Sequence, residues 1–62
     1  MLVTLNGVVQ PTDAATVLDL LGEVPPGHAV AVNGDVVPRA RLATRPLDDG
    51  DVVELVTAVP GG

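Results

Sequence analysis

The sequence predicts an α+β domain in which a mixed sheet of about five strands packs on one helix. Two observations carry this prediction. Asn-Gly occurs twice between short β-prone runs, and a single amphipathic run between the two pairs has helical spacing. With a last β-prone run near the C-terminus, the expected order is β-β-α-β-β-β. We expect residues 1–59 to form the domain and residues 60–62 a flexible tail.

The two Asn-Gly pairs predict two hairpins. Asn6-Gly7 separates residues 2–5 from residues 8–10, and Asn33-Gly34 separates residues 29–32 from residues 35–37. A two-residue type I′ turn needs positive φ at both central positions, which Asn and Gly adopt most readily.

Residues 16–21 are expected to form the helix. Thr16 is the candidate N-cap, and Asp19 stands where a capping box usually has Glu or Gln. Gly22 is a candidate C-terminal cap, and Pro25-Pro26 prevents continuation. The apolar stripe at helical spacing consists of Val17, Leu20, Leu21 and Val24. So short a helix is not stable alone and must lie on the sheet.

Residues 38–49 read as a polar, irregular connection held by Leu42 and Leu47. The Asp48-Asp49-Gly50 turn signal follows, and residues 51–59 are the longest β-prone run.

Composition excludes several classes of function. The 62 residues contain no Cys and no Lys, and His28 is the only histidine. Disulfides, thiolate metal sites, cysteine nucleophiles and lysine Schiff bases are therefore excluded, and His28 is expected to be an ordinary residue at a strand edge. No metal site and no bound cofactor are predicted. A chain of this size has little room for an enclosed substrate pocket, so a free-standing enzyme is not expected.

The net charge of −5 disfavours nucleic acid, because phosphate binding needs clustered Lys and Arg. An acidic surface suits a protein partner with a basic docking face, although the charge could equally serve only to keep a small apolar domain in solution. The N-terminus has no basic segment followed by a long apolar run. We therefore expect no signal peptide, no membrane span and a cytoplasmic location.

Alternation along the last strand assigns its two faces. Val53, Leu55 and Thr57 point one way, and Glu54 marks the opposite face as exposed. If this strand neighbours residues 29–32, an exposed apolar patch of Ala31, Val56 and Ala58 borders the tail. The alternative is that these are scattered surface residues, which are common.

The chain ends in Pro60-Gly61-Gly62. Glycines have no side chains and can thread a narrow active site of another protein. A free α-carboxylate is ionised at neutral pH and unreactive toward nucleophiles. A mixed anhydride with AMP supplies a leaving group that sulfur can displace, and the product is a thiocarboxylate. The sequence thus points to a tail that an ATP-dependent enzyme activates.

The whole chain resembles a known family. The motifs that carry the resemblance are Asn6-Gly7, Thr16-Val17 with Leu20-Leu21, Val32-Asn33, Val37-Pro38-Arg39, Asp49-Gly50-Asp51 and Val59-Pro60-Gly61-Gly62. With these motifs the chain resembles the ThiS sulfur carriers of thiamin thiazole biosynthesis, within the ubiquitin-like β-grasp superfamily.

The resemblance implies that the Gly62 carboxylate is adenylylated by a ThiF-like enzyme, which uses ATP, and is then converted to a thiocarboxylate. Sulfur would come from a donor such as a cysteine desulfurase and pass to a ThiG-like thiazole synthase. Gly61 and Gly62 carry the function, while Arg39 matches the family's Val-Pro-Arg element and is a candidate partner contact or a local structural residue.

Three alternatives remain open from the sequence. One is a MoaD-like carrier for molybdopterin, or a carrier for another thiolation pathway. Another is a ubiquitin-like modifier joined to lysines of target proteins. The third is a regulatory β-grasp module whose Gly-Gly end is incidental.

Overall fold

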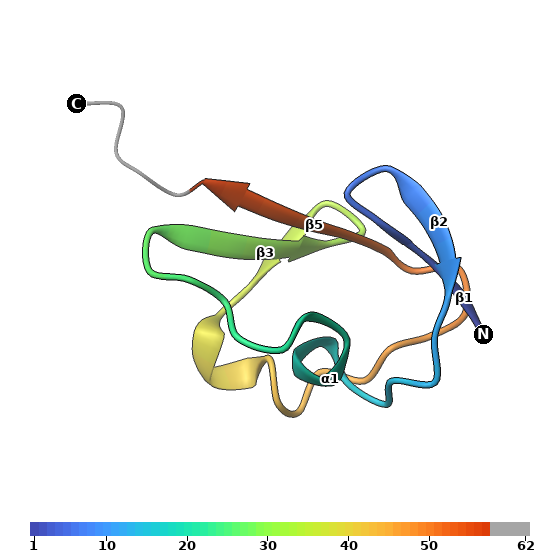
Figure 1. The fold of residues 1–62 in the computed structure, drawn as a ribbon. Helices are drawn as coiled ribbons and strands as arrows, with labels where there is room; N and C mark the ends of the chain where they lie inside the picture. The colour runs from blue at the N-terminus through green and yellow to red at the C-terminus, as the bar shows by residue number, and fades with distance from the viewer. Residues whose placement is uncertain (58–62) are drawn as a thin grey trace.

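The computed structural model describes residues 1–57, and its elements follow the predicted order (Figure 1). The predictions made for Ala58, Val59, Pro60, Gly61 and Gly62 lie outside the described residues. The strands are β1 (Leu2–Leu5), β2 (Val8–Pro11), β3 (His28–Val32), β4 (Asp35–Val37) and β5 (Val52–Thr57). The helix is α1 (Val17–Leu21), and a short 3₁₀ helix, η1, spans Arg39–Arg41.

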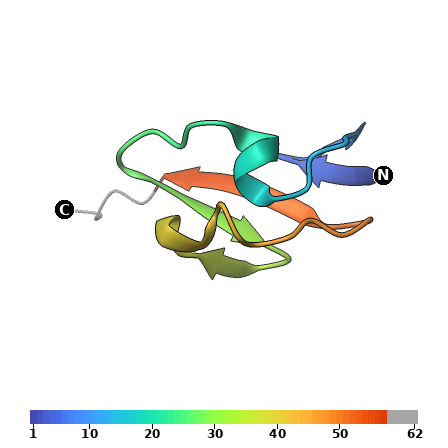
Figure 2. The same ribbon diagram turned by 90° about the horizontal axis from the view of Figure 1, so that it is seen from below.

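The five strands form one mixed sheet in the order β2-β1-β5-β3-β4. β5 is central: it runs parallel to β1 and antiparallel to β3, while β1–β2 and β3–β4 are antiparallel hairpins. α1 and the connection from β4 to β5 lie on one side of the sheet (Figures 1 and 2). The predicted fold class is confirmed. The position of β5 between the two hairpins brings the C-terminal strand into the middle of the domain.

Both hairpin turns have the predicted geometry. Asn6 and Asn33 adopt φ of 49° and 53°, and the glycines that follow them have φ of 83° and 87°. Each asparagine also fastens its turn to β5. The Asn6 Oδ1 accepts a hydrogen bond from the Leu55 N–H at 2.9 Å, and the Asn33 Oδ1 accepts one from the Val52 N–H at 2.9 Å. The residue that permits the turn therefore also docks it on the central strand.

The ends of α1 are capped as the sequence predicts. The Thr16 Oγ1 accepts a hydrogen bond from the Asp19 N–H at 3.1 Å, and Gly22, at φ 69°, donates its N–H to the Leu18 carbonyl. Thr16 is thus the cap rather than the first helical residue, so α1 begins one residue later than predicted.

The connection from β4 to β5 is more ordered than the sequence suggests. It contains η1, and its carbonyls satisfy the first N–H groups of α1: Val17 N donates to Arg45 O, and Leu18 N donates to Leu42 O. These groups have no partner within a helix, so the connection completes the helix start. The prediction of an irregular segment was wrong for residues 39–41.

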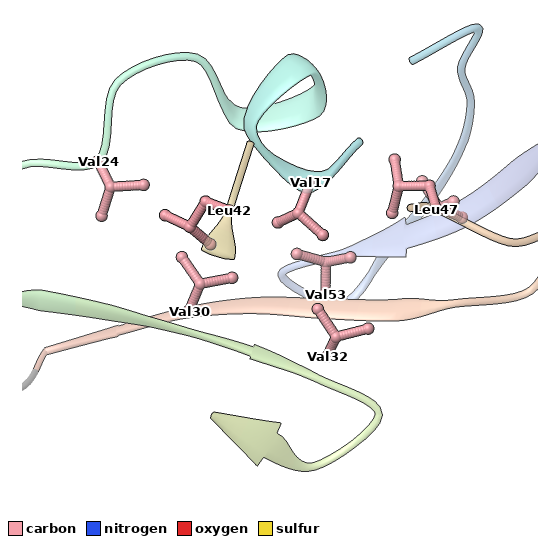
Figure 3. Close-up of a cluster of buried hydrophobic side chains, with 8 residues drawn as sticks. Val17, Val24, Val30, Val32, Leu42, Leu47 and Val53 are labelled. Atoms are coloured by element: carbon pink, nitrogen blue, oxygen red, sulfur yellow. The ribbon is translucent and has the colours of Figure 1, made fainter. Parts of the chain in front are cut away.

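Eight buried side chains form the core between sheet and helix (Figure 3). They are Val3, Val17, Val24, Val30, Val32, Leu42, Leu47 and Val53. The predicted anchors of the connection, Leu42 and Leu47, are both buried. Six valines and two leucines make a small core without aromatic rings, and each side chain contributes only about 1.5–3 kcal/mol through burial.

Candidate functional site

The predicted functional residues Gly61 and Gly62 lie beyond the described chain, so the site is built from the strand that leads to them. β5 is described as far as Thr57, and five residues follow it in the sequence. Its last described pairs are with β3, where His28 lies opposite Thr57 and Ala29 lies opposite Val56. The beginning of β3 and the loop before it therefore flank the end of β5.

The face of the sheet opposite α1 is apolar and uncovered within the described residues. The strand register places the side chains that alternate with the core residues on this face. We call this surface the open face. Its large exposed members are Leu2, Val9, Val36, Val52 and Val56. Glu54 is the single charged strand residue on it in residues 1–57.

The predicted patch forms part of the open face. Val56 is 38% exposed, and Ala31 is half-buried on the neighbouring strand, as expected. Ala58 lies outside the described residues. The register adds a residue that the patch prediction omitted, because Ala29 lies opposite Val56 while Ala31 lies opposite Glu54. Sequence alternation assigns Ala29 to the correct face, but only the register shows which alanine is next to Val56.

Arg39 is engaged within the domain. Its Nη1 donates to the Val24 carbonyl at 2.7 Å, and its Nη2 donates to the carbonyls of Pro25 and His28. The planar guanidinium suits this use, because its N–H groups form a fixed fork. Arg39 thus holds the loop that precedes β3, beside the end of β5. This is the local structural role; contact with a partner stays a prediction.

His28 is an ordinary residue at the start of β3, as expected. Its Nδ1 lies 3.2 Å from the Pro26 carbonyl oxygen. Residues 1–57 contain no group of three or more side chains that could hold a metal ion. In the same part of the chain, no helix is long and apolar enough to cross a membrane.

The buried carboxylate of Asp51, the residue just before β5, was not predicted from the sequence. Asp51 is 6% exposed. Its Oδ2 accepts the Asp48 N–H at 2.9 Å, and its Oδ1 accepts the Asn33 Nδ2 at 2.9 Å. The Arg45 Nη1 lies 3.6 Å from Oδ2. The Asp48 hydrogen bond, helped by Asn33 and Arg45, outweighs desolvation and lowers the pKa of Asp51. This carboxylate fixes the start of β5, and each of its oxygens accepts a hydrogen bond from the domain itself.

Comparison with known proteins agrees with this architecture. The model of the ThiS family matches residues 2–62. The sulfur carrier protein ThiS of Thermus thermophilus is 38% identical over 64 residues, which cover 98% of this chain and 100% of that protein.

A solved structure has the same fold over the full length. The crystal structure of the thiamine biosynthesis protein ThiS from Geobacter metallireducens aligns with a TM-score of 0.80 at 30% identity, covering 100% of both chains. The similarity is thus global, and it includes the C-terminal residues that the family model matches.

Proposed function

Because the chain belongs to the ThiS family of sulfur carrier proteins, we propose that it carries sulfur as a thiocarboxylate on Gly62. The observation that carries the proposal is the match through residue 62 in a chain ending in Gly61-Gly62. The sulfur is delivered to thiazole formation in thiamin biosynthesis. The name of the Geobacter metallireducens protein, a thiamine biosynthesis protein, supports this pathway.

The chemistry proceeds in two steps. The Gly62 carboxylate oxygen attacks the α-phosphorus of ATP, which forms an acyl adenylate and releases pyrophosphate. Sulfide then attacks the acyl carbon and expels AMP, which leaves the thiocarboxylate directly; where a persulfide delivers the sulfur instead, an acyl disulfide forms and a thiol reductant must cleave its S–S bond to release the thiocarboxylate. The chain has no cysteine that could compete for the activated carbonyl, and no lysine that could capture it as an amide.

The catalytic groups for both steps are supplied by a partner, a ThiF-like activating enzyme. Residues 1–57 offer no metal cluster, and their one buried ionisable side chain, Asp51, is engaged in structure. The domain contributes by docking on the enzyme, so that the Gly62 carboxylate is held next to the group with which it reacts. A thiazole synthase and a sulfur donor such as a cysteine desulfurase complete the proposed set of partners.

The open face supplies the proposed docking surface for the activating enzyme. Val56 and Ala31 are the described residues of the predicted patch, and Glu54 lies on the same face of the sheet; Ala58 follows Thr57 in the sequence. Five residues follow Thr57, and fully extended they span at most about 17 Å. A partner docked on the open face could therefore receive Gly62 in a pocket of its own. The net charge of −5 favours a basic partner surface.

Intact-mass spectrometry tests the proposal. The full chain is incubated with a ThiF-like enzyme, ATP and sulfide, and we expect a gain of about 16 Da from exchange of oxygen for sulfur. A chain lacking Gly62 should gain nothing. Asp13→Asn, a change at an exposed side chain, serves as a matched control and should react like the unaltered chain. Adducts on lysines of other proteins, without the mass gain, would instead identify a modifier.

A further inference from the structure

A cleft borders the sheet at its edge strand, β4. Its volume is about 360 Å³. It is lined by Val36, Val37 and Pro38 and by four residues of the following connection, Arg41, Thr44, Arg45 and Pro46. β4 is the edge strand of the sheet, so the cleft lies between an unpaired strand edge and the connection that follows it.

Two of the three arginines of an otherwise acidic chain, Arg41 and Arg45, line the cleft. All three Lys and Arg side chains lie in residues 39–45, against a net charge of −5. Arg45 is occupied by Asp51 and by the carbonyl of Pro46. Arg41 is exposed, and its guanidinium makes no hydrogen bond or ion pair within residues 1–57. Among residues 1–57, Arg41 is therefore the one cation in the cleft without a partner, enough for a single carboxylate but not for a nucleic-acid backbone.

The strand edge offers main-chain groups beside that cation. Asn33-Gly34 is a two-residue turn, so Val32 and Asp35 form the hydrogen-bonded pair that closes it. Hydrogen-bonded and non-hydrogen-bonded pairs alternate along an antiparallel ladder. The next pair, Ala31 with Val36, is therefore non-hydrogen-bonded, and the N–H and C=O of Val36 point away from β3. Pro38 has no N–H and ends the edge. Val36 thus provides one donor and one acceptor for an added strand.

We propose that this cleft binds an extended, carboxylate-bearing segment of a partner protein. The segment pairs with the Val36 backbone by strand addition and sets a carboxylate against the Arg41 guanidinium. A second copy of the chain is not the occupant that we propose, because two chains of net charge −5 repel each other. The site shares Val36 with the open face.

We expect weak binding at this site, because it offers few interactions. Two main-chain hydrogen bonds and one exposed charge pair predict a dissociation constant on the order of 1 mM for an isolated peptide. The segment would act together with a larger contact, as a linked second site.

Amide chemical-shift mapping on the full ¹⁵N-labelled chain tests the proposal. The probe is a blocked heptapeptide of alternating threonine and glutamate. We expect saturable shifts at Val36 and at the amides of residues 41–45. Arg41→Gln should weaken binding about two- to fivefold, which is the range for one exposed charge pair. Gln10→Glu on β2 lowers the net charge equally at the opposite edge and should leave the affinity unchanged.

Two further experiments change the peptide and keep the chain unaltered. A peptide of alternating threonine and glutamine should bind the unaltered chain about as weakly as the acidic peptide binds Arg41→Gln. A central proline in the acidic peptide should reduce binding, because it removes a ladder donor. Shifts centred on Val52 and Val56, equal affinity of the neutral peptide, or the same shifts with inorganic phosphate would each overturn the proposal.

Discussion

The Asp51 carboxylate joins the β3–β4 turn, the loop before β5 and the β4–β5 connection, so Asp51→Asn is a direct test of what holds the central strand. The Asp48 N and the Asn33 Nδ2 each lie 2.9 Å from a carboxylate oxygen of Asp51. Asparagine keeps one of these two acceptor oxygens and replaces the other with an NH₂ group, so one of the two donors faces another donor. A buried donor without its acceptor costs about 1–3 kcal/mol. Loss of the ion pair with the 30%-exposed Arg45 side chain adds about 1 kcal/mol at most.

The total, about 1–4 kcal/mol, is a large share of the stability of so small a domain. At about 0.05–0.15 kcal/mol per residue, a chain of this length has roughly 3–9 kcal/mol in all. Urea unfolding followed by far-ultraviolet circular dichroism measures the change, because the chain lacks aromatic residues that would report by fluorescence. With a slope of about 1 kcal/mol per molar urea, the midpoint should fall by about 1–4 M.

Asp49→Asn is the matched control. Asp49 is an exposed carboxylate two positions away that accepts the Leu2 N–H through Oδ1 at 2.7 Å. Its substitution removes the same charge, yet an amide oxygen can still accept that bond, so the expected loss is below about 1 kcal/mol. Equal midpoints for the two variants would refute the assignment of Asp51 as the buried clamp of β5.

Three further predictions concern pH, the Arg39 fork and the docking surface. The pKa of Asp51 is lowered in the folded state. Its contribution to stability is therefore present above its unfolded pKa of about 3.9 and is lost as pH falls through the folded pKa. In urea unfolding at a series of pH values, Asp51→Asn should reduce the loss of stability on acidification. Arg39→Lys cannot reproduce a fork across three carbonyls and should cost about 1–2 kcal/mol, whereas Arg41→Lys should be neutral in the same thermal melts. Val56→Glu should weaken association with the activating enzyme at least tenfold in calorimetry, by placing a charge in an apolar contact. The control is Leu18→Glu, which changes a similarly exposed side chain on α1 and should bind normally; unchanged affinity of Val56→Glu would rule out the patch.

Local signals in the sequence predicted the local structure. The Asn-Gly turns and the Thr16 cap depend on φ and on hydrogen bonds within a few residues, so their chemistry is visible in short windows. The Gly-Gly end likewise needs no tertiary information to be recognised. The family assignment rests on these same short motifs and is confirmed by comparison.

Nonlocal features could not be predicted in the same way. The insertion of β5 between β1 and β3 pairs it with residues 48 positions away in β1 and 21–29 positions away in β3, and alternation fixes faces but not register. This is why Ala31 entered the predicted patch while Ala29, the residue opposite Val56, did not. In the sequence, Asp51 is only the first residue of a β-prone run; its role depends on Asn33 and Arg45, which the fold brings to it. Arg39 likewise depends on carbonyls that lie 11–15 residues earlier in the chain.

The central claim, that Gly62 carries the sulfur, is tested most directly by locating the added mass within the chain. Trypsin cuts after Arg41 but not between Arg45 and Pro46, so a digest isolates residues 42–62 as one fragment. After reaction with the activating enzyme, ATP and sulfide, fragmentation of this peptide should place the gain of about 16 Da on Gly62 alone. A gain found on any other residue, or a chain lacking Gly62 that still acquires it, would contradict the account.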